Sequence, residues 1–599
     1  MLWLGILPLI FHVSAAQKND FDLLSFIILP EIRALKFEIE SVDRERQIPG
    51  YWFVAPYGQI DPEAPTHRYE QYQVGPYIYD NEGMLIWADS PLFNNRNIFD
   101  FKANWNINDE PHLSFILQHQ FDNSNKGSGV IMEKTYRIEH QVGVTNDVGA
   151  FNMYEFNILD GDRTALACTY RDRMTDLSDL DRPDEDSWVI TGGFVELDVE
   201  TGCVLFKWDS LDQVPLHESA RFHAWGSPDG KPGSDYVHIN AVDKNDAGDY
   251  IISLRFTNTV YMISGRDGRI MWRLGGNETD FDQDFTFHKQ HDVRFLESDG
   301  NRHIISLMNN GADEDNADEQ VSAALYIELD SNTMTARVIK RTERPDGGLT
   351  RLRGNVQHLS NNNTFIGWSE RGYHSEHAPN GDLLMWARFA STRFSSYRSY
   401  KFDWIGRPTA PPNVVSAVYG TSDDDFLTII YVSWNGATDV ARWDFYARAY
   451  NGSDRLFIGN IEKVSFESMF LVDGFMDWVS VEVVDKFGAV MGTSLEHRTN
   501  LPTNWIGLEV DDPALLFPSN SSVSTGTGDA KEAVYQAYEL LRGVEGFIAF
   551  LVIVSCIGCG SAVVMYVLRR RKSVYQNIPL HEGENLPIKD IPLYMSSDS

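Results

Sequence analysis

Cysteine is scarce in this chain, with four residues in 599, and this scarcity excludes a small disulfide-framework protein. Basic residues are also few: the chain has 51 lysines and arginines against 86 aspartates and glutamates, which gives a net charge of −35. Sequence-independent nucleic-acid binding needs a basic surface and is therefore disfavoured. The motifs G-x-x-x-x-G-K-S/T, H-E-x-x-H and G-x-S-x-G are missing. Nothing thus supports a P-loop, zincin or α/β-hydrolase site.

Apolar and aromatic residues are plentiful, at 43% and 12% of the chain, which excludes an acidic disordered protein. The length allows several domains, because single cores usually stop growing at roughly 250–300 residues. The 45 glycines, 25 tyrosines and 15 tryptophans favour β structure with many turns.

The two ends of the chain predict its compartment. Met1–Ala16 is apolar and ends in small residues, as a cleaved signal peptide does; an uncleaved signal anchor is the alternative, since no basic residue precedes the run. Phe547–Leu568 carries no charge over 22 residues, enough to cross a bilayer. The basic run Arg569–Lys572 follows at once and should stay cytosolic. We expect a single-pass type I membrane protein whose ectodomain is extracellular or in the secretory lumen.

An oxidising, glycosylating compartment gives two further expectations. A disulfide between Cys168 and Cys203 is one interpretation of the only lumenal cysteines, and two buried thiols are the other. Four N-x-S/T sequons precede the membrane and are candidate glycosylation sites. They are Asn277, Asn362, Asn451 and Asn520.

Four segments repeat one pattern: an apolar strand, a polar turn with glycine, and a returning strand that ends in tryptophan. They are 77–88, 195–209, 260–273 and 374–387, with Gly83, Gly202, Gly268 and Gly381 in the turns and Trp87, Trp208, Trp272 and Trp386 at the ends. Such hairpins are typical of β-propeller blades, and no helical periodicity competes. We predict an all-β fold with a propeller of about six blades over Pro49–Trp404.

The pattern changes after the proline-rich segment 407–412. Short alternating strands over Val414–Asn500 favour an immunoglobulin- or fibronectin-like sandwich, and Ser519–Asp529 is a polar stalk. The expected organisation is a signal peptide (1–16), an N-terminal segment (17–48), the propeller (49–407), the sandwich (408–505), the stalk (506–545), a transmembrane helix (546–568) and a cytosolic tail (569–599).

Polar side chains interrupt two strand-like runs, Asp235–Asn240 and Tyr250–Phe256. Residues two apart on a strand face the same side, so His238 and Asn240 are expected to project together. Arg255 lies on the neighbouring predicted strand. Imidazole, carboxamide and guanidinium on one face suit a tetrahedral oxyanion. An ordinary set of inter-strand hydrogen bonds is the alternative interpretation.

His288 and His291 are three residues apart, so on a strand they face opposite sides and make a poor metal pair. A neutral imidazole could instead act as a nucleophile, with Arg255 stabilising the charge that develops; a packed histidine at a blade edge is the alternative. The acidic run Asp313–Glu319 lacks the glycine and spacing of an EF-hand loop. A solvated loop is favoured there over a calcium site, and no metal site is predicted.

Several ordered motifs resemble the arylsulfotransferase family in its eukaryotic, secreted branch, over roughly Tyr51–Pro408. They are Y-V-H-I-N-A-V-D (236–243) with the later S-L-R (253–255), W-R-L-G-G (272–276), Q-H-D-V-R-F (290–295), G-N-V-Q-H-L-S (354–360) and W-I-G-R-P (404–408). The resemblance implies a six-bladed β-propeller. It also implies sulfuryl transfer from a phenolic sulfate ester to an acceptor phenol, without a nucleotide sulfate donor and without a cofactor.

By motif, the resemblance makes His291 a nucleophile that is transiently sulfated. It gives His238, Asn240 and Arg255 the task of binding the sulfuryl oxygens and helping to protonate the leaving phenolate. Gln357 falls in a segment that contributes to the same pocket.

One departure concerns the run N-M-Y-E-F (152–156), where Tyr154 stands in place of the histidine usual in that branch. A phenol can donate a hydrogen bond or act as a general acid, but near neutral pH it is a poor base with a pKa of about 10, and we expect Tyr154 to bind substrate. Two functions therefore stay open: a membrane-anchored sulfotransferase acting on phenols, and a non-catalytic propeller and sandwich that bind a protein or glycan partner. Fold alone does not choose between them.

Overall fold

The computed structural model describes residues 22–58, 74–94, 96–107, 110–118, 127–143, 150–159, 163–221, 233–422, 425–449 and 453–501. The expected signal peptide, stalk, membrane span and cytosolic tail lie outside the described residues, as do Asn451 and Asn520. Within the described ranges, no helix is long and apolar enough to cross a membrane. Asn277 and Asn362 are both exposed, and their glycosylation stays a prediction.

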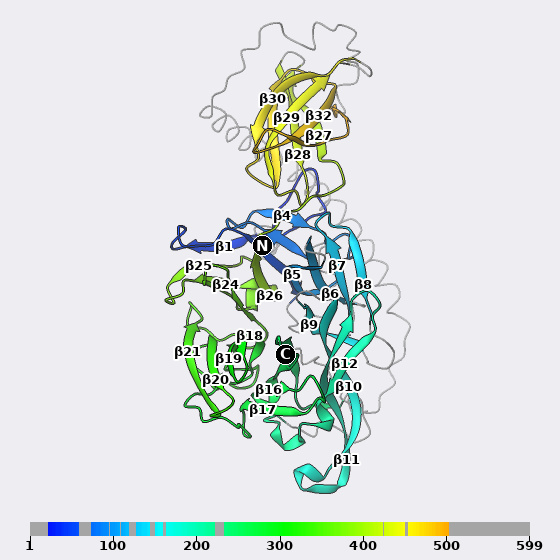
Figure 1. Ribbon diagram of the computed structural model, residues 1–599. Coiled ribbons are helices and arrows are strands. Elements are labelled where there is room, and N and C mark those ends of the chain that lie inside the picture. The colour runs from blue at the N-terminus through cyan, green and yellow to red at the C-terminus, as the bar shows by residue number, and fades with distance from the viewer. Residues whose placement is uncertain are drawn as a thin grey trace, which may run out of the picture. The chain divides into compact units, whose positions relative to one another are not determined.

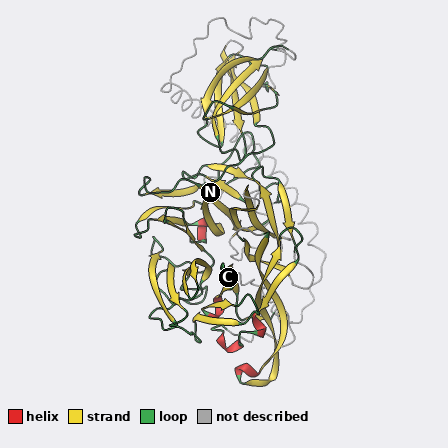
Figure 2. Cartoon of the chain, viewed as in Figure 1, coloured by secondary structure: helices red, strands yellow, loops and turns green. Residues whose placement is uncertain are grey.

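The described chain is all-β, and its helical segments are single three-residue 3-10 turns (Figures 1 and 2). These turns are η2 (Ser178–Leu180), η3 (Ser210–Asp212), η4 (Leu216–Glu218), η5 (Arg255–Thr257) and η6 (Glu370–Gly372). Strands 1 to 26 form five sheets, which are largely antiparallel.

Two of these sheets have four consecutive strands each. They are β14 (Ile239–Lys244), β15 (Tyr250–Leu254), β16 (Thr259–Ile263) and β17 (Ile270–Gly275), and then β18 (His291–Asp299), β19 (Arg302–Asn309), β20 (Ala323–Asp330) and β21 (Thr335–Glu343).

A third sheet adds an N-terminal strand to four later ones. Its strands, in spatial order, are β1 (Phe37–Ser41), β25 (Leu383–Phe389), β24 (His374–His377), β23 (Thr364–Gly367) and β22 (Asn355–His358). A fourth sheet joins the two ends of the propeller-like region, because its last strand pairs with its first. The order is β26 (Phe394–Phe402), β2 (Tyr51–Gly58), β3 (Tyr77–Tyr79) and β4 (Leu85–Ala88).

The fifth sheet has nine strands, because β7 and β9 pair at Gly127 and Phe151 and thereby join two sets of strands. The first set is β5 (Ile98–Ile107), β6 (Glu110–Gln118), β7 (Gly127–Glu133) and β8 (Ile138–Val142). The second is β9 (Ala150–Ile158), β10 (Thr164–Leu177), β11 (Arg182–Asp198) and β12 (Val204–Asp209), with β13 (Ser234–Asp235) parallel to β11.

Six strands contact one another in a closed cycle: β5 with β9, β9 with β14, β14 with β18, β18 with β22, β22 with β26, and β26 with β5. A closed cycle of sheets packed face to face leaves few free edges, as in a propeller. The side chains that these strands direct toward one another therefore meet in the middle of the cycle.

The repeated hairpins occur where the glycine and tryptophan pattern predicted them. Gly202 lies in the β11–β12 turn and Gly268 in the β16–β17 turn, with φ of 69° and 74°, a left-handed conformation that glycine adopts without strain. Trp208 is buried, and its indole N–H donates to the Gly268 carbonyl at 3.0 Å. The tryptophan of one hairpin thus contacts the turn of the next, which explains why the two features repeat together.

The expected disulfide is not formed, and both cysteines are free thiols. Cys168 is buried on β10 opposite Phe194 of β11, whereas exposed Cys203 follows the end of that strand, its carbonyl accepting the Asp198 N–H. Phe194 and Asp198 are four residues apart, which is about 13 Å along a strand. Cysteines bridge only when their Cα atoms are within about 7 Å.

Two further sheets follow the propeller-like region. One contains β27 (Asn413–Ser422), β28 (Asp425–Ser433) and β31 (Glu467–Asp473); the other contains β29 (Val440–Arg448), β30 (Leu456–Glu462), β32 (Trp478–Asp485), β33 (Val490–Thr493) and β34 (His497–Arg498). Buried Ile430 and Val432 of the first sheet belong to one core with Trp443 and Val481 of the second. This two-sheet core is the arrangement expected of a sandwich.

Candidate active site

His291 is the first residue of β18, and its side chain is buried and held at both ring nitrogens. Nδ1 lies 2.8 Å from Asn310 Oδ1, an acceptor, so Nδ1 carries the proton in the neutral ring. Nε2 then has the lone pair, which accepts the backbone N–H of Arg353 over a long 3.3 Å. Asn310 is itself fixed, because its Nδ2 donates to the carbonyls of Thr350 and Arg353 at 2.9 Å each.

Electrostatics keep this imidazole neutral. Burial, and next the positive charge of Arg255, hold the pKa of His291 well below its usual 6.5. The ring therefore has an unprotonated Nε2 throughout the physiological pH range. A neutral, oriented imidazole is a competent nucleophile.

Arg255 opens η5 after β15, and its side chain is 0% exposed. Its backbone N–H donates to the His238 carbonyl at 3.0 Å, and Nη2 donates to the Arg351 carbonyl at 3.1 Å. Among the described residues, Nε and Nη1 are buried without a hydrogen-bond partner. Buried donors on a cation are nearly always paired, so this guanidinium is arranged to receive an anion.

His238 lies just before β14 and forms a dyad with Asp235. Its Nδ1 is 2.5 Å from one carboxylate oxygen of Asp235, and the other oxygen accepts the His238 backbone N–H at 2.9 Å. Nε2 is buried and has no partner within the part of the chain that is described. A carboxylate on Nδ1 fixes the tautomer and leaves Nε2 to take up or deliver a proton.

Tyr154, the departure from the expected histidine, lies on β9 beside this dyad. Its buried ring packs edge-on against His238, with 5.1 Å between ring centres, and is also 5.7 Å from the ring of Tyr170. Tyr154 therefore contacts the polar centre that contains His238.

Two of the expected residues, Asn240 and Gln357, hydrogen-bond to backbone groups, and their predicted roles at the site stay predictions. Asn240 donates from Nδ2 to the backbone carbonyl of Gln290 at 2.7 Å, so its donor positions the segment before His291. The amide of Gln357 exchanges two 2.8 Å hydrogen bonds with the backbone of Lys401, which ties β22 to β26. Neither amide has a donor directed at the nitrogens of His291.

Asp235 and Asn310 were not identified from the sequence. The spacing D-x-x-H in 235–238 is a usable signal for the first, because a carboxylate three residues before a histidine can reach its ring. Asn310 follows the end of β19, and nothing in its local sequence links it to His291.

A buried ion-pair cluster supports the site next to His291. It has three cations and three anions: Lys102, Arg294, Arg398, Asp100, Glu155 and Asp292. Arg294 bridges Glu155 and Asp292 at 2.7 Å each, and Arg398 lies 2.8 Å from Asp100. Asp292 also accepts the Val356 N–H at 2.8 Å. Because Asp292 follows His291 directly, the cluster fixes the start of β18.

The acidic loop Asp313–Glu319 reaches this site and is paired with basic residues. Asp315 is 2.8 Å from Arg221, Asp318 pairs with Lys289, and Glu314 is 3.8 Å from Arg255. Within the described ranges, no group of three or more metal-ligating side chains is found.

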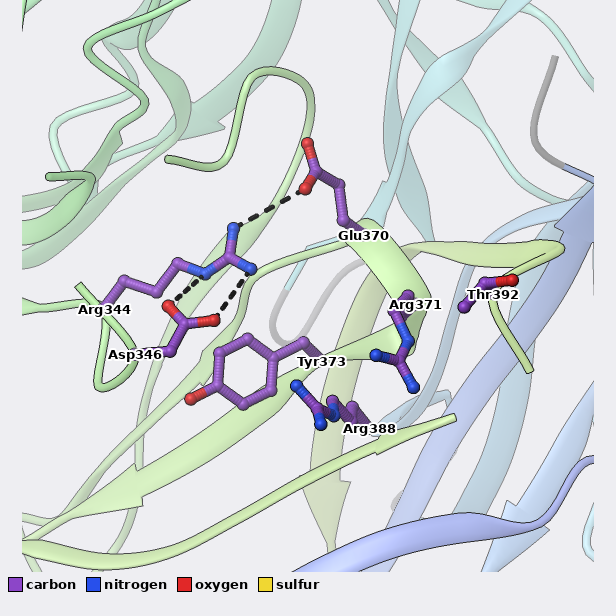
Figure 3. Close-up of a pocket in the computed structure, with 7 residues that line it drawn as sticks. All are labelled: Arg344, Asp346, Glu370, Arg371, Tyr373, Arg388 and Thr392. Carbon is purple, nitrogen blue, oxygen red and sulfur yellow. Dashed lines mark hydrogen bonds and ion pairs between the residues drawn. The ribbon is translucent and has the colours of Figure 1, made fainter. Parts of the chain in front are cut away.

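A surface pocket of about 230 Å³ shares no residue with the site around His291 (Figure 3). Its lining residues are Arg344, Asp346, Glu370, Arg371, Tyr373, Arg388 and Thr392. Arg344 pairs with Asp346 and Glu370, while Arg371 and Arg388 both reach Glu38. The three arginines of this pocket are thus paired with lining carboxylates or with nearby Glu38.

Comparison with known proteins gives one family match. The model of the family Arylsulfotransferase (ASST) matches residues 111–390, which include Tyr154, His238, Arg255 and His291. The match suggests an arylsulfotransferase-like function. No curated protein is similar to this chain at a significant level.

Similarity to solved structures is weak. Virginiamycin B lyase from Staphylococcus aureus, crystallised as an inactive variant with quinupristin, is 9% identical, with 67% of this chain and 86% of that chain covered and a TM-score of 0.24. AztD from Citrobacter koseri is 8% identical, covering 60% and 99%, with a TM-score of 0.25. The GH43 protein BlXynB from Bacillus licheniformis is 7% identical, covering 64% and 86%, with a TM-score of 0.24. These scores are too low to support an argument, so the architecture rests on the sheets themselves.

Proposed function

We propose that this protein is a sulfotransferase that moves a sulfuryl group from a phenolic sulfate ester to an acceptor phenol through a sulfated His291. The observation that carries the proposal is the neutral, oriented imidazole of His291 together with the buried, incompletely paired guanidinium of Arg255, whose positive charge lowers the pKa of His291. The match of residues 111–390 to the arylsulfotransferase family supports the same chemistry.

In the first half-reaction, His291 Nε2 attacks the sulfur of the donor ester. The N–S bond forms as the aryl O–S bond breaks, and the phenolate leaves with both electrons of that bond. Arg255 binds the sulfuryl oxygens with Nε and Nη1, the two nitrogens that lack a partner among the described residues. His238 Nε2–H delivers its proton to the phenolate, with Asp235 holding the other ring nitrogen.

The backbone N–H of Arg353 has a second task in this step. It occupies the Nε2 lone pair over 3.3 Å before the reaction, a bond long enough to be displaced cheaply. Once Nε2 carries sulfur, the same N–H can donate to a sulfuryl oxygen instead. It then contributes to stabilising the charge that develops there.

In the second half-reaction, the acceptor phenol passes its proton to His238 Nε2 and attacks the sulfur. The N–S bond breaks, and its electrons return to His291 Nε2 as the new aryl sulfate leaves. No proton or electron is left over after the two steps. Tyr154 packs on His238 and would orient it, since a phenol is a poor base near neutral pH.

The same proposal covers the wider organisation of the chain. We count the cycle of β5, β9, β14, β18, β22 and β26 as the inner strands of six blades, with the nine-stranded sheet contributing two. We place the ectodomain outside the cytosol, anchored by 546–568, as in the eukaryotic secreted branch of the family. Protease protection of sealed vesicles tests that orientation.

The decisive experiment uses the full-length chain purified in detergent, with 4-nitrophenyl sulfate as donor and a second phenol as acceptor. We expect acceptor-dependent release of nitrophenolate and a sulfuryl adduct that peptide mass analysis assigns to His291. His291→Ala should abolish both, whereas the matched control His288→Ala should retain them. A folded chain that gives neither release nor adduct with a panel of aryl sulfates would instead favour a binding protein.

A further inference from the structure

The acidic loop between β19 and β20 is folded on itself and has a defined shape. The carbonyl of Gly311 accepts the N–H groups of Asp318 and Glu319 at 2.7 and 2.9 Å. Asp313 Oδ1 accepts the N–H groups of residues 315 and 316 at 3.0 and 2.7 Å. These bonds fix the backbone of the loop on both sides of Glu314.

Basic residues hold the loop on both sides of Glu314. Arg221 pairs with Asp315 at 2.8 Å, and Lys289, two residues before His291, pairs with Asp318. The Glu314 carboxylate lies 3.8 Å from Arg255 Nη2 and 3.9 Å from Arg221 Nη1. The Glu314 side chain is 39% exposed, whereas that of Arg255 is 0% exposed. Glu314 thus stands between solvent and the guanidinium.

This arrangement sets how much negative charge the site accepts. His291 is neutral, and three cations at the loop lie near four carboxylates, which gives a net charge of −1. The cations are Arg221, Arg255 and Lys289, and the carboxylates are Asp313, Glu314, Asp315 and Asp318. Among these carboxylates Glu314 is the one paired with Arg255. A monoanion that binds Arg255 shares the guanidinium with Glu314. A dianion of the same shape brings a second negative charge close to that carboxylate, where like charges repel.

Sulfate and phosphate esters of one phenol differ in this respect. Both present tetrahedral oxygens that a guanidinium can bind. A sulfate monoester is a monoanion, whereas a phosphate monoester has a second pKa of about 6 and is a dianion above it. The two esters have nearly the same shape, so a site can distinguish them by charge, and the negative charge of Glu314 repels the dianion more than the monoanion.

We infer that Glu314 is a specificity-determining residue that excludes dianionic phosphate esters from the Arg255 site and admits monoanionic sulfate esters. This inference rests on the proposed function, since it concerns the same site. Its role is to repel the wrong anion, and it takes no part in the bond changes at sulfur.

The test compares Glu314→Gln with Asp315→Asn in the full-length chain. The second variant removes the same charge from the same loop. Asp315 and Glu314 both lie near Arg221, but of the two it is Glu314 that also lies near Arg255. The measured quantities, both at pH 7.5, are the Michaelis constant for the sulfate donor and the inhibition constant of phenyl phosphate. For a partly exposed charge we expect Glu314→Gln to lower the inhibition constant about tenfold. The Michaelis constant should change less than about threefold, and Asp315→Asn should change neither beyond about twofold.

A second measurement uses pH. Below about pH 5.5 phenyl phosphate is a monoanion, so the wild-type chain should bind it nearly as well as a sulfate, and Glu314→Gln should bring little further gain. If Glu314→Gln strengthens binding of both esters equally, or of neither, the proposed exclusion of dianions by Glu314 is wrong.

Calorimetric titration of phenyl sulfate and phenyl phosphate separates this inference from the proposed function. The compared quantity is the ratio of the dissociation constants of the two esters. If Glu314→Gln alters this ratio but the chain shows no turnover, the role of Glu314 is supported and sulfuryl transfer is contradicted. If the chain turns over and the ratio is unaltered, sulfuryl transfer is supported and the role of Glu314 is contradicted. A folded chain that binds neither ester would overturn both.

Discussion

Replacing Glu155 by glutamine tests whether the buried ion-pair cluster is a balanced unit. The Glu155 side chain is fully buried on β9, with one carboxylate oxygen 2.7 Å from Arg294 and the other 3.2 Å from Arg398. Lys102 is 3.6 Å away. Glutamine keeps the size and one acceptor oxygen but removes the charge, so packing is nearly unchanged.

The expected magnitude follows from the charge balance. The three cations and three anions of the cluster sum to zero, and Glu155→Gln leaves a net charge of +1 that is largely shielded from water, since Arg294 is 17% exposed and Arg398 is 0% exposed. Breaking a buried pair by removing one partner typically costs about 3–5 kcal/mol, because the remaining charge is uncompensated. That is a large part of the roughly 5–15 kcal/mol that stabilises a domain.

Denaturant unfolding followed by tryptophan fluorescence measures the difference. The control is Glu133→Gln, which breaks an ion pair with Arg137, whose side chain is 76% exposed. Exposed pairs contribute about 0–1 kcal/mol, so the control should change stability little. A Glu155→Gln cost below about 1 kcal/mol, or one equal to the control, would refute the argument from charge balance.

Three further predictions concern a buried histidine, the orientation of the nucleophile, and the free thiols. Burial lowers the pKa of His374 from 6.5 to about 3, so the native chain binds fewer protons than the unfolded chain between these values and loses stability as pH falls below 6.5. The loss of stability is about 2 kcal/mol at pH 5. In His374→Gln the unfolding free energy should no longer show this loss. If the variant keeps the pH dependence of the original chain, His374 is not its cause. Asn310→Ala removes the closer of two acceptors of the His291 Nδ1–H and leaves the Lys289 carbonyl at 3.1 Å. It should lower kcat about 10–100-fold with little change in KM, whereas a loss confined to KM would contradict a positioning role. Iodoacetamide should label exposed Cys203 in the native chain and buried Cys168 only after unfolding, as read by peptide mass analysis; protection of both until a reductant is added would contradict two free thiols.

The hairpin repeat was predictable because its causes are local. A turn that needs a positive φ selects glycine, and a large side chain at a fixed offset fills the contact with the next turn, as Trp208 does at Gly268. The predicted disulfide was wrong because its geometry depends on strand pairing, which is not local in the sequence. Sequence spacing does not give the register of β10 on β11, which sets Cys168 and Cys203 apart.

The candidate site was predictable in its residue types but not in its orientations. The assignment of His238 and Asn240 to one face assumed regular strand alternation. In the structure His238 precedes β14 with φ of 52°, and the β14–β15 register shifts between Ile239 and Ala241, which places Asn240 in an irregularity. Each such bulge re-aims the side chains beside it. The pairing register of β14 on β15 determines where these two side chains point, and a single sequence does not reveal that register.

A positive φ at a non-glycine residue, as at His238, recurs around the cycle of inner strands. Asp100, His238, Asp292 and Arg353 all have φ between 52° and 63°, a left-handed conformation that costs non-glycine residues roughly 1–2 kcal/mol each. Hydrogen bonds compensate at three of them: Asp235 holds His238, Asp292 accepts the N–H of residue 356, and Asp100 accepts the N–H of residue 156. Glycine would relieve this strain, but it would remove the imidazole, carboxylate or guanidinium that each kink aims. At Asp100, His238 and Asp292 the strained backbone therefore carries a side chain that belongs to the ion-pair cluster or to the candidate site.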